Sequence, residues 1–239
     1  MANPDIIRPQ IWLKQDLISA GFTTRALDRR FNQDGNNYDS LSDKFSVIYE
    51  LHGGETRLAY AKQVHGGRVV TVNEPGFVGE ADGLITTSAD MTLAIQVADC
   101  GVLLLADREN GIIGALHSGW RGTADGIAGN AIVRMKELGS LPENIEVFIG
   151  PCISSQVYEV GEEVASRFDG RFVLRDGFAK PHLAIREALK QQLRDAGIPE
   201  INLEIDQRCT YLNPDLFHSY RRDGKKSGRM IGFIRMNNN

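Results

Sequence analysis

The residues of this 239-residue chain best suited to chemistry are His65, Cys100 and His117, each at the end of a predicted strand. Imidazole nitrogen and thiolate sulfur bind zinc, and a catalytic zinc site has three protein ligands and an open position. The same side chains suit a thiol mechanism in which His117 activates Cys100 as a nucleophile. Because the three residues lie far apart in the sequence, their spacing leaves both interpretations open.

Buried strands are expected to position these side chains. Hydrophobic patterning predicts strands over residues 56–63, 93–98, 102–106 and 112–116. Polar residues are placed where these strands end, which indicates a site at a sheet edge. Residues 118–122 then turn the chain into a helix, and apolar residues recur at helical spacing from Ile127 to Leu138.

The start of that helix is a candidate anion site. Residues 120–122 open the helix, where unpaired N–H groups and the helix dipole favour anions. Gly122 permits a ligand to approach the backbone closely. Arg121 adds donors suited to phosphate or carboxylate, the alternative being a structural ion pair. Arg25 is a second candidate cation, beside a polar segment at 26–37 that suits a lid.

Other polar residues have weaker claims to a function. Asp99, next to Cys100, is either a proton acceptor, a hydrogen-bond partner for one of the candidate histidines, or a cap at the strand end. The remaining cysteines, Cys152 and Cys209, are expected in the core. The remaining histidines are expected at the surface or in packing contacts, and Arg221–Gly224 is expected to be a structural salt-bridge cluster.

The rest of the chain predicts a mixed α+β architecture in one domain. Further strands are expected at 17–25, 81–87, 145–149, 201–205 and 230–234. Helices are expected after a cap at Ser42, through Val164 and Phe168, and over 183–196. The runs 56–63 and 68–72 are expected to pair across a Gly-Gly turn. Strands and helices alternate unevenly, which favours mixed sheets over a regular barrel.

Composition excludes several classes of protein. The 42% hydrophobic and 24% charged residues are typical of an ordinary soluble domain. A net charge of −4 gives no electrostatic case for nucleic acid. The sequence has no secretory signal pattern and no apolar run long enough for a membrane helix. Three cysteines fit reduced thiols, so we expect a cytoplasmic location.

Several short motifs together resemble one known family, the YfiH-type laccase-domain proteins, also described as polyphenol oxidases, as purine nucleoside phosphorylases and as peptidoglycan editing factors. The motifs span most of the chain in the family's order: K-Q-V-H-G (62–66), A-D-G-L-I-T (81–86), A-D-C (98–100), H-S-G-W-R-G (117–122), G-P-C-I (150–153), Y-E-V-G (158–161), R-C-T-Y (208–211), S-Y-R-R-D-G (219–224) and S-G-R-M (227–230).

The resemblance implies a fold, a metal and an activity. The fold is a single α+β domain over residues 1–239, with α/β/β/α layers and mixed sheets, similar to the catalytic domain of cytotoxic necrotizing factor. The metal is zinc, bound by His65, Cys100 and His117. The activities are phosphorolysis of adenosine, inosine, guanosine and methylthioadenosine, and deamination of adenosine. The expected partners are therefore purine nucleosides and phosphate, without nucleic acid or membrane, and the oligomeric state stays open.

Roles follow for the candidate residues. Cys100, His117, Asp99 and Arg121 are assigned to catalysis, and Arg25, Arg121 and Gly122 to substrate binding. The chain departs from the family pattern after Arg25, at Ser42 and at Gly101, where the family usually has a glycine loop, an asparagine and a proline. The first two departures concern the expected lid and substrate wall.

Two rival functions remain. One is a cysteine hydrolase or amidase that uses Cys100 and His117, since related proteins are linked to removing wrongly built peptidoglycan precursors. The other is copper-dependent phenol oxidation, which ranks lower because multicopper centres need several clustered histidines and this chain has five in all.

Overall fold

The computed structural model describes residues 5–14, 16–27, 45–53 and 56–237, so the Ser42 cap and most of the expected lid lie outside the described residues. The strands are β1 (Ile6–Ile7), β2 (Ile18–Thr23), β3 (Arg57–Lys62), β4 (Val69–Thr71), β5 (Gly76–Glu80), β6 (Gly83–Thr86), β7 (Met91–Val97), β8 (Gly101–Asp107), β9 (Ile112–Ser118), β10 (Ile145–Ile149), β11 (Val173–Leu174), β12 (His182–Leu183), β13 (Leu203–Ile205) and β14 (Met230–Met236). The α-helices with assigned bounds are α2 (Ser46–Leu51), α3 (Trp120–Ala124), α4 (Ile127–Glu137), α5 (Glu162–Ala165), α6 (Ile185–Asp195) and α7 (Tyr220–Asp223).

Within the described residues, two six-stranded sheets face each other, and β11 and β12 form a separate two-stranded sheet. The first has the order β1-β2-β14-β7-β3-β5 and the second has the order β13-β10-β8-β9-β6-β4. Both are mixed: β3 lies parallel to β5 and β7, β13 is parallel to β10, and β4 is parallel to β6, whereas the other pairs are antiparallel. The mixed-sheet expectation is confirmed.

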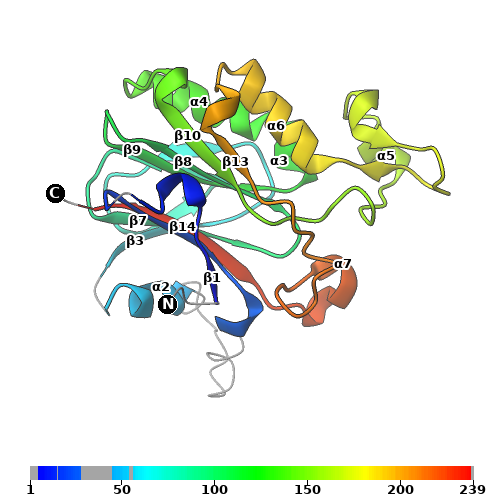
Figure 1. Cartoon of the computed structure of the whole chain (residues 1–239), viewed down its shortest axis with the longest axis horizontal. Coiled ribbons are helices and arrows are strands. Elements are labelled where there is room, and N and C mark those ends of the chain that lie inside the picture. Colours follow the sequence, from blue (N-terminus) through cyan, green and yellow to red (C-terminus); the bar gives the residue numbers. More distant parts are fainter. Residues whose placement is uncertain (1–4, 15, 28–44, 54–55, 238–239) are drawn as a thin grey trace.

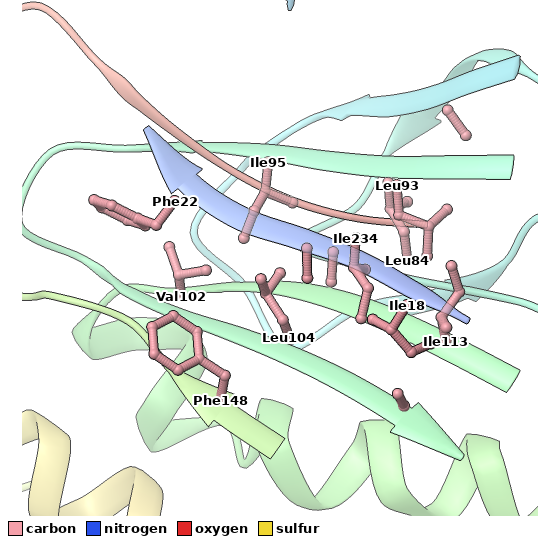
Figure 2. Packing of buried hydrophobic residues seen from close by; sticks show 14 of the residues in the cluster. Ile18, Phe22, Leu84, Leu93, Ile95, Val102, Leu104, Ile113, Phe148 and Ile234 are labelled. Atoms are coloured by element: carbon pink, nitrogen blue, oxygen red, sulfur yellow. The ribbon is translucent and has the colours of Figure 1, made fainter. Parts of the chain in front are cut away.

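The main core lies between the two sheets, and alternation along the strands supplies it. In β8, Val102 and Leu104 point into this core, where Phe148 and Phe22 also pack (Figure 2). Leu103, in between, belongs to the cluster beneath the helices. The strand is apolar on both sides because both faces of its sheet are covered.

Helices cover the outer faces and complete the layers (Figure 1). On the second sheet, α4 and α6 bury apolar residues at helical spacing: Ile127, Ala128, Ala131, Ile132 and Met135, then Ile185, Ala188, Leu189 and Leu193. On the first sheet, α2 packs Val47 and Ile48 against Leu58 and Phe233. The α/β/β/α layering therefore agrees with the expected fold class.

Several local expectations were wrong. The segments 56–63 and 68–72 do not pair: β3 stays in the first sheet, while β4 joins β6 in the second. The Gly-Gly turn lies between these two strands, but they do not pair because the chain crosses there from the first sheet to the second. The helix after His117 is also divided, because Gly126 adopts a left-handed φ of 75° between α3 and α4.

No helix within the described segments is both long and apolar enough to cross a membrane.

The core between the sheets is expected to dominate stability. Phe148→Ala should lower the free energy of unfolding by about 3–5 kcal/mol, because this buried ring leaves a cavity in the core. Urea denaturation measures the loss. Phe77→Ala is the matched control, since Phe77 is 56% exposed on β5 and its loss should cost less than about 0.5 kcal/mol. Equal losses in both variants would contradict this account of the core.

Candidate metal and catalytic site

Sheet topology explains how three remote residues meet. Because β3 and β7 are parallel, both end at the same edge of the first sheet, and the chain then crosses to the second sheet after each. The first of these crossings carries His65 and the second carries Cys100. In the second sheet, the start of β8 pairs with the end of β9, which places Val102 opposite His117. One ligand atom from each of the three residues lies within 4.8 Å of the others.

His117 is the buried member of the group, at 2% exposure. It shares a face of β9 with Ile113 and Ala115, so its ring lies at the rim of the core between the sheets. Its Nδ1 is 2.8 Å from Oδ1 of Asp82. The carboxylate accepts a hydrogen bond from Nδ1–H, so Nε2 is the ring nitrogen available to a metal.

His65 lies on an exposed turn after β3 and meets His117 edge to face, with ring centroids 4.7 Å apart at an angle of 88°. Its φ of 63° is left-handed, a conformation that non-glycine residues rarely adopt. The same carboxylate stabilises this turn. Oδ1 of Asp82 accepts from the backbone N–H of His65 at 2.9 Å, and Oδ2 accepts from those of Gly66 at 2.8 Å and Val64 at 3.2 Å.

Electrostatics favour a charged pair at the centre of the group. Burial raises the pKa of the Cys100 thiol, but the charges and hydrogen bonds of His117 and His65 outweigh this and lower the pKa to about 6. Burial lowers the pKa of His117, but the Cys100 thiolate and the Asp82 carboxylate outweigh this and raise the pKa to about 9. The metal-free group therefore holds a thiolate, the form that a metal binds and that acts as a nucleophile.

Two glycines, Gly119 and Gly122, lie where a side chain would clash with the group or with the backbone that carries it. A Cβ at Gly119 would lie 3.1 Å from Sγ of Cys100 and 3.2 Å from Cδ2 of His65, so any side chain here would enter the site. A Cβ at Gly122 would lie 2.7 Å from the carbonyl oxygen of Gly66. The close approach at Gly122 is thus to the backbone that carries His65, which gives glycine a packing reason at this position.

Asp99 contacts residues near the C-terminal end of the chain. Its carboxylate accepts from the hydroxyls of Thr210 at 2.6 Å and Ser219 at 3.0 Å, and from the N–H of Arg221 at 2.7 Å. Its φ of 85° is left-handed. The carboxylate on His117 is that of Asp82, so of the alternatives considered for Asp99 a hydrogen bond to this histidine is not the one observed, and its contacts instead fix the end of the strand.

The two candidate cations lie in different surroundings. Arg121 is exposed, its guanidinium stacks 4.4 Å from the ring centroid of Trp120, and it forms no ion pair within the part of the chain that the structure describes. Arg121 is the second residue of α3, which is only five residues long, so the dipole of this helix is smaller than that of the single long helix expected from the sequence. Arg25 donates through its guanidinium to the carbonyl of Pro214, and its N–H donates to Leu216 at 2.9 Å.

The other cysteines and histidines mostly fit the structural roles predicted for them. Cys152 and Cys209 are buried, and burial raises the pKa of Cys152 to about 11. Nδ1 of His52 is 2.9 Å from the carbonyl of Ile48, and Nδ1 of His182 is 2.7 Å from that of Ser155. His182 is buried against Phe178.

The expected salt-bridge cluster near the end of the chain is also structural. Arg222 pairs with Asp223 at 2.8 Å and donates to the carbonyls of Thr210, Tyr211 and Phe217.

Asp82 is the residue that sequence reasoning missed. It precedes the buried strand β6 inside the A-D-G-L-I-T motif, and its side chain is fully buried. An aspartate directly before a short strand that is mostly apolar was the available signal, because a buried carboxylate needs partners.

The electrostatics predict an unusually reactive thiol. In metal-free protein, the rate of Cys100 alkylation by iodoacetamide should rise with pH around a midpoint near 6, because the thiolate is populated above that pH. Mass spectrometry of the labelled peptide measures the rate. His117→Ala should move the midpoint upward, and Cys100→Ala should remove the fast phase. A midpoint near the ordinary thiol value of about 8.5 would contradict the ion pair.

Known proteins are similar to this chain in sequence and in fold. The family model described as "Multi-copper polyphenol oxidoreductase laccase" matches residues 31–237. A protein of Deinococcus radiodurans named purine nucleoside phosphorylase is 44% identical over 216 residues, which cover 84% of this chain and 81% of the relative. One of the same name from Clostridium acetobutylicum is 32% identical, covering 92% and 93% of the two chains.

Two solved structures have a similar fold. The YfiH protein of Bacillus licheniformis superposes with a TM-score of 0.85 at 25% identity, covering 98% of this chain and 97% of that one. YlmD of Geobacillus stearothermophilus gives a TM-score of 0.84 at 25% identity, covering 100% and 98%. By its motifs, its layered fold and these matches, the chain belongs to the laccase-like YfiH family.

Proposed function

We propose that this protein is a zinc-dependent purine nucleoside phosphorylase that also deaminates adenosine. The observation that carries the proposal is the convergence of two imidazoles and one thiolate, with ligand atoms within 4.8 Å of one another, in a chain whose relatives are named purine nucleoside phosphorylase. We take adenosine, inosine, guanosine and methylthioadenosine as its substrates.

The residues present fit a zinc ion. Two nitrogens and one sulfur match the donor set of catalytic zinc sites, and Nε2 of His117 is kept available by the bond from Nδ1 to Asp82. The absence of a side chain at Gly119 leaves room on one side of the group. Copper also binds these donors, but a multicopper centre needs more histidines, and the residues described contain one such metal-capable group.

Phosphorolysis requires phosphate to be held against the sugar. A phosphate oxygen forms a bond to C1′ while the bond from C1′ to the purine nitrogen breaks, and the purine leaves with the electron pair and takes up a proton. We assign phosphate binding to Arg121 and Arg25, since guanidinium groups bind phosphate oxygens in a bidentate manner. Arg121 is exposed, with its guanidinium carbon 4.4 Å from the ring centroid of Trp120, so solvent and a phosphate ion can reach it.

In deamination, a water oxygen adds to C6 of adenine and ammonia leaves. A zinc ion held by His65, Cys100 and His117 would supply Lewis acidity and lower the pKa of a bound water toward neutrality. The chain's own residues hold the ligands in place: Asp82 orients His117, and Asp99, whose carboxylate already accepts three hydrogen bonds, anchors the backbone next to Cys100.

One observation favours a second candidate, a cysteine hydrolase or amidase. The thiol of Cys100, whose pKa is lowered, would be the nucleophile, and His117 would be the base. Asp82, whose carboxylate lies 2.8 Å from Nδ1 of His117, would orient the base. Peptidoglycan precursors would be the substrate class for this candidate.

The first test is the product formed from adenosine with and without inorganic phosphate. We expect adenine and a sugar phosphate only when phosphate is present, inosine in its absence, and loss of both after chelation of zinc. Chromatography of the products and metal analysis of the protein measure this. His65→Ala, Cys100→Ala and His117→Ala should lose zinc and activity together, whereas His52→Ala, which removes a histidine bonded to a main-chain carbonyl, should keep both.

The rival functions give different results. Full activity on nucleosides in zinc-free protein would refute the zinc proposal. Hydrolysis of amide substrates by zinc-free protein, abolished by alkylation of Cys100, would support the cysteine hydrolase instead.

The role of Arg121 can be separated from that of the metal. Arg121→Ala should raise the KM for phosphate about tenfold or more, because a charged hydrogen-bond donor is lost, and should leave deamination unchanged. Steady-state kinetics of both reactions measure this. Arg134→Ala is the control, since Arg134 lies on α4 in a surface pair with Glu137. An equal fall in both reactions of Arg121→Ala would refute phosphate binding.

A further inference from the structure

We propose that Asp82 is the positioning residue of this site, and that one carboxylate sets both the ring orientation of His117 and the turn that presents His65. This inference rests on the proposed metal site and goes beyond it, because it assigns the geometry of two ligands to a residue that binds no metal itself.

The first observation is the number of donors on a single buried group. The Asp82 side chain has no exposed surface, and four N–H groups point at its two oxygens: the backbone N–H of Val64, His65 and Gly66, and Nδ1–H of His117. An ionised carboxylate is stable in a protein interior only with such donors. Three consecutive N–H groups around one oxygen pair form an anion-binding nest.

The second observation is that the backbone of Asp82 is fixed independently of its side chain. Its N–H donates to the carbonyl of Arg68 at 3.1 Å, and its carbonyl accepts from the N–H of His117 at 2.7 Å. The carboxylate therefore has a defined position between the His65 turn and the end of β9, at the place where the two sheets meet.

The third observation is the strain in the turn. His65 has a φ of 63°, and Gly66 is in close contact with Gly122. A left-handed backbone is unfavourable for histidine, and the converging hydrogen bonds offset this cost. Without the carboxylate, the turn would lose the contacts that oppose this strain, and His117 would be free to rotate or to exchange its ring proton.

The test is Asp82→Asn. An amide keeps the shape, but its NH₂ group meets N–H donors and its single oxygen replaces two. Zinc affinity, measured by competition with a chelator, should fall about ten- to a hundredfold. In histidine-selective ¹⁵N spectra, the slowly exchanging Nδ1 proton of His117 should be present in the wild type and absent in Asp82→Asn.

The matched control is Asp107→Asn. Asp107 is also fully buried, and its carboxylate accepts from the N–H groups of Glu109 and Asn110, but it lies at the other end of β8 from Cys100. This variant should lose stability while keeping zinc affinity and the His117 proton.

Three outcomes would overturn the proposal: wild-type zinc affinity in Asp82→Asn, an equal loss of affinity in Asp107→Asn, or no protected Nδ1 proton on His117 in the wild type. If Asp82→Asn does not fold, the wild-type spectrum still decides. If the wild type binds no zinc, the proposed function fails, whereas the proton on His117 in metal-free protein still tests Asp82.

Discussion

A buried negative charge joins the two halves of the site. The Asp82 carboxylate accepts hydrogen bonds from three backbone N–H groups of the turn after β3 and from the ring N–H of His117 at the end of β9. An unpaired carboxylate in the interior would be unstable, so these N–H groups stabilise its charge, and the hydrogen bonds hold the N–H groups in place. The geometry of His65 and His117 depends on these hydrogen bonds.

The layered architecture makes such a contact possible. β3 and β7 end at one edge of the first sheet, and the chain crosses from each into the second sheet, where β8 begins beside the end of β9. The apolar layer between the sheets, with Phe22, Val102 and Phe148, packs the two sheets against each other (Figure 2). Reactive side chains gather at the rim of this layer because the strands themselves are filled with apolar residues.

A second buried carboxylate ties the site to the end of the chain. Asp99 precedes Cys100, has a left-handed backbone, and binds Thr210, Ser219 and Arg221, more than a hundred residues away. Cys100 therefore lies between an anchored residue and the start of β8. The glycine at 119 beside it leaves the thiolate accessible from one side. Such an arrangement combines rigid ligands with an open face, as metal catalysis and thiol catalysis both require.

The sequence by itself determined the chemistry of the candidates and most of the local structure. Apolar runs located β7, β8, β9 and β10 within one or two residues, and helical spacing located α4 and α6, because burial pattern and backbone period are local properties. It also singled out His65, Cys100 and His117, which the structure brings together. Their types and their places after strands were sufficient for that.

Only the tertiary structure decided which partners meet. The sequence predicted that 56–63 would pair with 68–72, but the chain crosses between sheets there, and β3 pairs with β5 and β7 instead. It offered Asp99 as one possible hydrogen-bond partner of the histidines, whereas it is Asp82, 35 residues before His117, that lies 2.8 Å from Nδ1 of that ring. Partner choice depends on contacts between segments far apart in the chain, and on the burial energy of the whole assembly, neither of which a local pattern contains.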